Sequence, residues 1–308
     1  MDTLDDILDT LNLKGALYFR TDFSAPWSVS VPDLPGAARF HLVIQGQCHV
    51  RLECGRSLCL NSGDLIMIPR GKRHILSHSE TYSAPPLEDV LAHTNYDGKG
   101  VLTLGNGDPA ASTQMVCGHF TFRRGADHPL LRALPDAIRI TSAMRATQPW
   151  LDETLRLITR RVFTDSTGSA AAITRLSEVV FVEVIRLGIA DTPAMQRMLE
   201  GFSDRYIGKA LQLMHADSTA HWTVESLARE IGMSRSRFAD RFRHHLSMSP
   251  MAYLSEWRLQ KALSLLDNSQ HSVQQVAIQS GYQSPAAFTR AFTGKFGIAP
   301  SEYRRRAG

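Results

Sequence analysis

The residues of this chain best suited to chemistry are four cysteines in its first 117 positions and a basic block at its C-terminal end. Cys48, Cys54, Cys59 and Cys117 match none of the paired spacings that bind structural metals. From residue 203 to residue 308 the sequence has 14 Lys and Arg against 8 Asp and Glu, a net charge of +6, while the remainder carries −2. A basic block on a nearly neutral body suits a polyanionic partner.

Two passages in the basic block repeat one pattern, which indicates an internal duplication: WTVESLAREIGMSRSRFADRFRHHLSMSP and HSVQQVAIQSGYQSPAAFTRAFTGKFGIAP. Both contain a small alanine, a turn glycine, a capping serine, two phenylalanines four residues apart and a closing proline. These are Ala228 and Ala277, Gly232 and Gly281, Ser234 and Ser284, Phe238 with Phe242 and Phe288 with Phe292, and Pro250 and Pro300. The alanine lets two helices cross closely, the glycine permits a left-handed turn, and the phenylalanines anchor the second helix. The pattern therefore predicts two helix-turn-helix units.

The region from about Arg205 to Arg305 resembles the AraC/XylS family of transcription regulators. GYQSPAAFTRAFTGKFGIAPSEYRR is similar to the closing motif of that family almost throughout. The resemblance implies a sequence-specific DNA-binding regulator and not an enzyme, with double-stranded promoter DNA and RNA polymerase as its partners. It also implies that a long linker helix, Pro250–Leu266, holds the two units so that they enter successive major grooves.

The same resemblance assigns the side chains that face DNA. They are Arg235, Ser236, Ala239, Asp240 and Arg243 in the first recognition helix, and Ala286, Ala287, Thr289 and Arg290 in the second. Arginine can reach guanine edges or phosphates, whereas alanine and threonine offer apolar or weak polar contacts. Asp240 stands where the family often has a base-reading side chain, and its carboxylate would either orient Arg243 or accept from a cytosine.

The first part of the chain, to about residue 122, has short alternating or apolar runs separated by Gly, Pro, Asn and Asp, which is typical of a small sandwich or barrel. The run GDLIMIPRGKRHIL, which ends near His74, resembles the second cupin motif. FHLVIQGQCHV resembles a degenerate first motif around His41. Cupin enzymes usually have two histidines in the first motif, but Arg39 stands where the earlier one would be. This departure argues against an oxygenase-type iron centre.

The cupin resemblance places His41 and His74 inside the barrel on facing strands, and VCGHF supplies Cys117 on a later strand. With a further ligand such as His78, His119 or water, these three side chains would suit a tetrahedral zinc ion. The alternative is that the three are hydrogen-bonded core residues.

Two other hypotheses for the effector stay open. One is a thiol switch, in which an oxidant modifies Cys117 or releases a metal. The other is a metal-free sugar regulator whose barrel is lined by aromatic residues such as Phe19, Trp27 and Phe40. The expected effector is therefore a small molecule, a metal or an oxidant.

We predict an α+β protein of three parts: a cupin-like β-barrel sensor over residues 1–125, a helical linker and dimerisation segment over 126–202, and an all-α DNA-binding domain over 203–308. Helical spacing over Pro149–Phe163 and Ala170–Ile189 predicts two helices, which either cover the barrel or pair two chains. The family resemblance favours the homodimer. Tyr82–Pro109 is expected to be a long loop with at most one irregular strand, and Ala190–Ser203 a hinge.

The sequence contains no run of about eighteen apolar residues, so no membrane contact is expected. The N-terminus, MDTLDDILDTL, is acidic and amphipathic, unlike a secretory signal, and this indicates a cytoplasmic protein. Neither the operator nor the direction of regulation is indicated by the residues.

Overall fold

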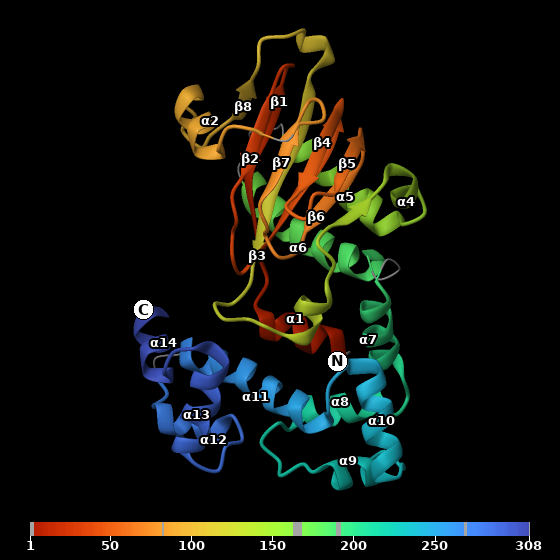
Figure 1. Ribbon diagram of the computed structural model, residues 1–308, viewed down its shortest axis with the longest axis vertical. Helices are drawn as coiled ribbons and strands as arrows, with labels where there is room; N and C mark the ends of the chain where they lie inside the picture. Colours follow the sequence, from red (N-terminus) through yellow and green to blue (C-terminus); the bar gives the residue numbers. More distant parts are fainter. Residues whose placement is uncertain (1–2, 82, 163–167, 189–191, 268–269, 308) are drawn as a thin grey trace. The chain divides into compact units, whose positions relative to one another are not determined.

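The computed structural model describes residues 3–81, 83–162, 168–188, 192–267 and 270–307. The chain divides into two compact units (Figure 1). The sandwich unit comprises residues 13–121 and 134–189, and the helical unit comprises residues 1–12, 122–133 and 190–308. This division differs from the predicted one at residues 125 and 202, because the helical unit takes in two short segments from the N-terminal part of the sequence. In the part of the chain that the structure describes, no helix is long and apolar enough to cross a membrane.

Two β-sheets make up the sandwich unit. The six-stranded sheet has the order β10-β6-β3-β9-β1-β8 and the four-stranded sheet the order β2-β7-β4-β5. Neighbouring strands are antiparallel, except that β1 and β8 run parallel. The strands are β1 (Lys14–Phe23), β2 (Ser28–Val31), β3 (Ala37–Gln45), β4 (Gln47–Leu52), β5 (Ser57–Asn61), β6 (Leu65–Ile68), β7 (His74–Ser77), β8 (Val101–Leu104), β9 (Thr113–Thr121) and β10 (Ile138–Ile140). The predicted cupin-like architecture is confirmed, as two facing sheets rather than a closed barrel.

Alternate residues of the strands fill the space between the sheets. In β4, Cys48, Val50 and Leu52 are buried while the residues between them are partly exposed, which is the period of two that a half-buried strand requires. Met115 and Cys117 of β9, from the other sheet, belong to the same core. The interior of the unit is therefore built from both sheets.

The outer face of the six-stranded sheet is covered by α6 (Ser169–Gly188), against which α5 (Pro149–Val162) packs. The rings of Phe120 on β9 and Phe181 on α6 lie 5.1 Å apart. Helix and sheet approach closely at Gly15, where a Cβ atom would lie 2.4 Å from Ser177 Oγ. The two predicted helices are confirmed, and α6 covers the β-structure. The short helix α4 (Ser142–Ala146) precedes them.

The segment predicted as a long loop, residues 82–109, contains regular structure. Helix α2 (Leu87–Thr94) is followed by β8 and then by the 3-10 helix η1 (Pro109–Ala111). Val90 and Leu102 from this segment are buried in the core. The loop prediction was wrong because the Pro and Asn residues mark the ends of short elements: α2 begins after Pro86 and ends at Asn95, which has a left-handed φ of 50°.

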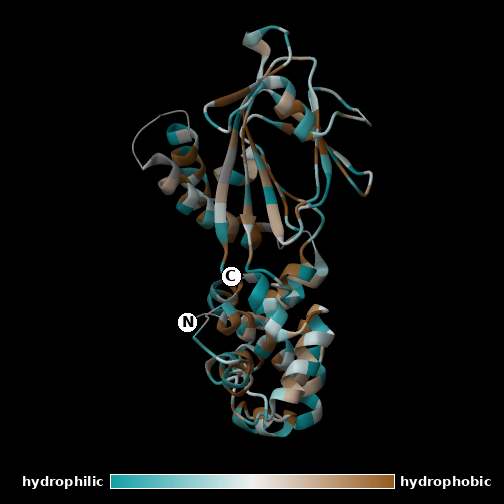
Figure 2. Ribbon diagram, turned by 90° about the vertical axis from the view of Figure 1, so that its left-hand side faces the viewer, coloured by the Kyte–Doolittle hydropathy of each residue, from teal (hydrophilic) through white to brown (hydrophobic). Residues whose placement is uncertain are grey.

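The helical unit consists largely of amphipathic helices, and Figure 2 shows hydrophobic and hydrophilic residues side by side in this part of the chain. They are α1 (Thr3–Leu11), α3 (Pro129–Ala133), α7 (Pro193–Ser203), α8 (Ile207–Ala216), α9 (Val224–Glu230), α10 (Arg235–Leu246), α11 (Pro250–Asp267), α12 (Val273–Gln279), α13 (Pro285–Phe296) and α14 (Pro300–Ala307). The long linker helix predicted over 250–266 is α11, which runs between α8–α10 and α12–α14 (Figure 1).

The hinge predicted over Ala190–Ser203 is wrong for its described part, which is the helix α7. Pro193 begins this helix, where a missing N–H has no cost. Gly201 lies within it at a close contact, since a Cβ there would lie 2.7 Å from His245 Cβ on α10. Pro193 therefore starts a helix, and Gly201 allows α7 to pack on α10, so neither residue marks a flexible connection.

Candidate nucleic-acid interface and sensor cavity

Helices α9 and α10 form the first helix-turn-helix unit. Thr223 and Ser226 cap α9 reciprocally: the Ser226 N–H donates to Thr223 Oγ1 at 3.0 Å, and the Thr223 N–H donates to Ser226 Oγ at 2.9 Å. Gly232 in the turn has a φ of +71°, which side chains other than hydrogen disfavour. Ser234 occupies the predicted cap position of α10, but its side chain makes no capping hydrogen bond.

Helices α12 and α13 repeat the arrangement. Ser272 and Gln275 form the capping box of α12, and the turn glycine, Gly281, has a φ of +79°. Here the predicted cap is confirmed, because Ser284 Oγ accepts from the Ala287 N–H at 3.2 Å. The duplicated sequence pattern thus produces duplicated geometry.

The predicted phenylalanine anchors are confirmed in both units. Phe238 and Phe242 of α10, and Phe288 and Phe292 of α13, are fully buried. Phe292 also packs against Tyr303 of α14, with ring centroids 5.7 Å apart. With these faces buried, the opposite faces of α10 and α13 point outward.

The three predicted metal ligands lie together inside the sandwich unit. His41 on β3 is the register partner of Cys117 on β9, and His74 lies on β7 of the facing sheet. Cys117 Sγ lies 3.1 Å from His41 Nδ1, and His41 Nε2 lies 2.8 Å from His74 Nε2. His74 Nδ1 donates to the Lys72 carbonyl oxygen at 2.8 Å.

These contacts form one directed row of hydrogen bonds between neutral groups. Because His74 Nδ1 carries a proton, its Nε2 accepts from His41 Nε2–H, and His41 Nδ1 accepts from the Cys117 thiol. Burial lowers the pKa of His74 to about 4 and lowers the pKa of His41 well below its usual range. Burial also raises the pKa of the Cys117 thiol. The row therefore stays uncharged at neutral pH.

The row does not fit the predicted zinc ion. Cys117 and His74 contact opposite edges of the His41 ring, so the three side chains do not converge on one tetrahedral centre. Of the suggested fourth ligands, His78 is hydrogen-bonded to the Trp27 backbone and His119 lies opposite Arg39. Among the residues that the structure describes, no group of three or more His, Cys, Asp or Glu could hold a metal ion.

A small cavity of about 20 Å³ lies beside the row, which is room for one water-sized molecule. Its walls come mainly from apolar side chains of β1, β2, β7 and β9, with Leu87 of α2 and Leu102 of β8 completing them. His41, Cys117 and Thr21 are the polar side chains in the wall. Two members of the hydrogen-bonded row, His41 and Cys117, thus form part of the wall of a largely apolar cavity.

Comparison with known proteins agrees with both parts of this description. The Cupin family profile matches residues 2–190, and the Helix-turn-helix domain profile matches residues 227–306. The chain is 30% identical to the HTH-type transcriptional regulator AlkR of Acinetobacter baylyi, with 100% of each chain covered. A putative AraC-like transcription regulator of Streptomyces lividans is 28% identical, with 99% of this chain and 98% of that protein covered. The DNA-binding domain of AdpA in complex with a target DNA covers 33% of this chain and 92% of that chain, at 31% identity and a TM-score of 0.32.

The chain belongs to the AraC family of transcription regulators. It carries a Cupin domain followed by a helix-turn-helix domain, and relatives that match its full length are named as transcription regulators and not as enzymes. The predicted function, DNA-binding regulation of transcription, is confirmed at this level.

The AraC-type assignment of DNA-facing residues can now be placed on the structure. On α10, Arg235, Ser236, Asp240 and Arg243 are exposed, and Ala239 between them is half-buried. Asp240 Oδ1 lies 3.5 Å from Arg243 Nη1, one of the two predicted roles for this carboxylate. The face presented by α10 therefore carries two arginines, one of them paired with an acid.

The corresponding face of α13 carries less charge. Ala286 and Arg290 are exposed, while Ala287 and Thr289 are half-buried. Arg290 is the charged member of this set. The two recognition helices of this AraC-family regulator therefore differ in the number of polar contacts that they can offer to a groove.

Two further arginines on α10, Arg237 and Arg241, differ in whether their guanidinium groups are available to DNA. Arg237 is exposed beside the assigned face, in a shallow hollow along the helix, and the family pattern did not point to it. Arg241 is held by a carboxylate, because its guanidinium hydrogen-bonds to Asp204. Burial opposes ionisation of Asp204, but the bonds from Arg241 and from backbone N–H groups lower its pKa to about 2. The basic repeat RSR was the signal for Arg237.

The remaining cysteines do not form a site in the regulator. All four are free thiols. Cys48 is buried in the core, where burial raises its pKa to about 12, whereas Cys54 is exposed in a turn. Cys59 lies opposite His49 in register, with Sγ 3.9 Å from Nε2.

The aromatic residues suggested for a sugar cavity lie in three different places. Phe19 lines the small cavity and packs near Tyr96. Trp27 is buried against Phe23, with ring centroids 5.0 Å apart. Phe40 packs against Phe120, whose ring contacts α6 on the outer face of the sheet. The structure therefore does not gather them into one aromatic-lined chamber.

Proposed function

We propose that this regulator acts in the cytoplasm and reads promoter DNA with the outward faces of α10 and α13. The observation that carries the proposal is that most of the assigned side chains are exposed on two recognition helices whose other faces are anchored by buried phenylalanines. The proposed contacts are Arg235, Ser236, Ala239, Asp240 and Arg243 on α10, and Ala286, Ala287, Thr289 and Arg290 on α13.

Removal of one arginine from α13 tests this assignment. An operator is first selected from random duplex DNA by the wild-type chain, and its dissociation constant is measured for Arg290→Ala. A lost base or phosphate contact should cost about 1–3 kcal/mol. Arg56→Ala is the matched control, because Arg56 is an exposed arginine in the turn between β4 and β5 of the sandwich unit. If both variants bind the operator like wild type, Arg290 does not contact DNA.

For the sensor, we propose a small and largely apolar effector that enlarges and occupies the cavity beside His41 and Cys117. Support comes from the apolar walls and from the neutral hydrogen-bonded row, which offers few polar groups to a ligand. A sugar would leave many hydroxyl groups unpaired in such a cavity, which is costly. A metal ion would require His41 and its neighbours to rearrange.

Thermal stabilisation by apolar probes tests the effector class. Benzene and longer apolar molecules should raise the melting temperature of the wild-type chain through preferential binding to the folded state. Val31→Phe should abolish that rise because Val31 is buried in the cavity wall, whereas Val101→Phe on the exposed part of β8 should preserve it. A rise of equal size in both variants would place the binding elsewhere.

The metal alternative has its own measurement. Elemental analysis of the purified, untagged chain and of Cys117→Ala should find far less than one zinc per chain in both. Stoichiometric zinc in the wild type, lost in the variant, would instead favour a rearranged metal centre at His41, His74 and Cys117.

We also propose that two chains pair through α5 and α6, and that the DNA-bound dimer acts on RNA polymerase. Trp150, 83% exposed, lies two helical turns from the exposed Leu157 on α5, and Val179 is exposed on the neighbouring α6. A second copy of the chain would cover such a patch. Trp150→Glu together with Leu157→Glu should convert a dimer to a monomer in analytical ultracentrifugation, and an unchanged mass would refute this interface.

A further inference from the structure

A segment between two strands of the sandwich unit is part of the helical unit. Residues 122–133, here called the strap, follow β9 and precede β10 in the sequence, yet they pack with the helices that carry the two helix-turn-helix units. The strap includes the short helix α3. Its contacts with α11, α13 and α14 are polar and specific.

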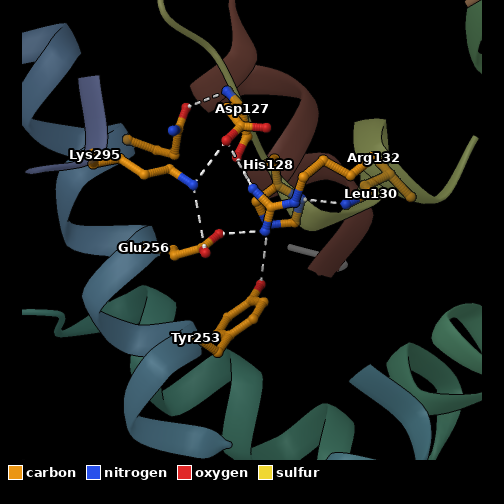
Figure 3. A network of polar contacts seen from close by, with 8 residues as sticks. Asp127, His128, Leu130, Arg132, Tyr253, Glu256 and Lys295 are labelled. Atoms are coloured by element: carbon orange, nitrogen blue, oxygen red, sulfur yellow. Dashed lines mark hydrogen bonds and ion pairs between the residues drawn. The ribbon is translucent and has the colours of Figure 1, made fainter. Parts of the chain in front are cut away.

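The centre of the strap joins α11 and α13 through four alternating charges (Figure 3). Asp127 Oδ2 lies 2.7 Å from Lys295 Nζ of α13 and 2.9 Å from Arg132 Nη1. Glu256 of α11 lies 2.6 Å from Arg132 Nη2 and 3.5 Å from Lys295 Nζ. Each charge thus has two partners of opposite sign, and Lys295 belongs to the second recognition helix itself.

A row of hydrogen bonds ties the strap to the first turn of α11, and through it to α8 and α1. The Leu130 N–H donates to His128 Nδ1 at 3.1 Å, so His128 Nε2 carries the proton that faces Tyr253 Oη of α11 at 3.3 Å. Tyr253 Oη in turn lies 2.9 Å from His215 Nε2 of α8, and His215 Nδ1 lies 3.3 Å from Asp6 Oδ2 of α1. Every hydrogen bond in this row, from Leu130 to Asp6, therefore has one donor and one acceptor.

The beginning of the strap holds the C-terminal helix. Arg123 forms an ion pair with Asp267 at the end of α11. Arg124 donates to the Tyr303 carbonyl oxygen of α14 at 2.7 Å and stacks on its ring at 4.5 Å, while Tyr303 Oη donates to the Arg124 carbonyl oxygen at 2.8 Å. The strap therefore contacts the C-terminal half of the helical unit at α13 and at α14, and α11 takes part in both sets of contacts.

We propose that the strap is a positioning element for DNA recognition: it fixes the second helix-turn-helix unit on α11 and thereby sets the spacing of the two operator segments that the chain reads. Asp127 is the key positioning residue, because it connects the strap directly to a recognition helix. It acts through Lys295 and Glu256 and touches no DNA itself. The inference extends the proposed reading of DNA by α10 and α13, since it concerns the distance between them.

The experiment compares Asp127→Ala with Asp136→Ala in the full chain. Asp136 is a matched control, because it pairs with Arg70 in the sandwich unit and lies nine positions away. Binding is measured to three duplexes: the selected operator, the same operator with one base pair inserted between its two segments, and a duplex that keeps only the segment bound by the first unit. Asp127→Glu and Asp127→Asn are measured in parallel.

We expect Asp127→Ala to weaken binding to the intact operator roughly fivefold and to lessen the discrimination against the inserted base pair. Binding to the single-segment duplex should stay at the wild-type value, and Asp127→Glu should restore the preference for native spacing. Asp136→Ala should match wild type on all three duplexes. The proposal is overturned if Asp127→Ala and Asp127→Asn discriminate spacing like wild type, or if they lose as much affinity for the single-segment duplex. If the wild-type chain itself binds all three duplexes with equal affinity, the proposed reading of two operator segments by α10 and α13 is wrong instead.

Discussion

His128 and His215 approach one atom, the phenol oxygen of Tyr253, from two separate segments of the chain. The geometry requires opposite tautomers: His128 donates from Nε2, and His215 accepts at Nε2 while its Nδ1–H faces Asp6. His215 also stacks on Trp257 at 3.7 Å. Two neutral imidazoles are therefore structural parts of the helical unit.

The first prediction concerns pH and stability. Burial lowers the pKa of His215 to about 4; the Asp6 carboxylate opposes this shift, and Lys261 adds to it. Burial also lowers the pKa of His128 well below its usual range, and the nearby His215, Arg132 and Lys295 lower it further. The unfolded imidazoles take up protons near pH 6.5 while the folded ones stay neutral, so stability is complete above about pH 6.5 and declines as the pH falls toward 4. Urea unfolding should lose about 2 kcal/mol for His215 between about pH 7.5 and pH 5. His215→Asn should show a shallower pH dependence, and an identical slope would contradict the assignment.

A second prediction contrasts the two turn glycines. Both have a positive φ, so Gly232→Ala should cost about 1 kcal/mol of folding free energy through backbone strain alone, since nothing lies within 4 Å of its added Cβ. Gly281→Ala should cost more, about 2–4 kcal/mol, because its Cβ would lie 2.7 Å from the Ser218 carbonyl oxygen. Chemical denaturation measures both. Equal losses would mean that the chain relaxes around Ser218.

The third prediction is the salt dependence of operator binding. Arg235 is exposed at the start of α10, where a guanidinium can reach phosphate. Arg235→Ala should reduce the slope of log affinity against log salt by about one. Operator affinity is measured by fluorescence anisotropy over a series of salt concentrations. An unchanged slope with a lower affinity for one base pair would instead assign Arg235 to base contact.

The fourth prediction separates the cysteines by reactivity. Cys54 is exposed and should react quickly with a maleimide, whereas Cys117 and Cys48 are buried with raised pKa values and should react only on unfolding. Mass spectrometry of the labelled native chain locates each adduct. Rapid labelling of Cys117 in the native chain would support the hypothesis of a thiol switch. Slow labelling would agree with its role as a hydrogen-bond donor to His41.

Local sequence patterns predicted the helix-turn-helix units well. Gly232, Gly281 and the four phenylalanines recur at the same spacing in both units, so their spacing alone identifies the turns and buried faces. The cupin motifs likewise brought His41, His74 and Cys117 together. Whether three nearby side chains converge on an ion or line up in a row depends on ring orientation, which sequence spacing does not determine.

Long-range packing explains what sequence analysis missed. Pro193 and Gly201 together suggest a hinge in the sequence, yet Gly201 makes a close contact with His245, more than forty positions away. The strap gave no local signal at all, because Asp127 and Lys295 meet across 168 positions of the chain. The role of such a residue depends on its partner in the folded chain, and a single sequence does not identify that partner.

The chain passes between its two compact units four times, after residues 12, 121, 133 and 189. The two units of this regulator are therefore not two consecutive segments of the sequence, each of which could be exchanged by itself. A chimera that joins a foreign sensor to residue 203 would discard α1 and the strap along with the native one. If the strap sets the operator spacing, a chimera keeps that spacing only when the new N-terminal part supplies segments that pack on α11 and α13. The two parts of such proteins are therefore expected to be inherited together.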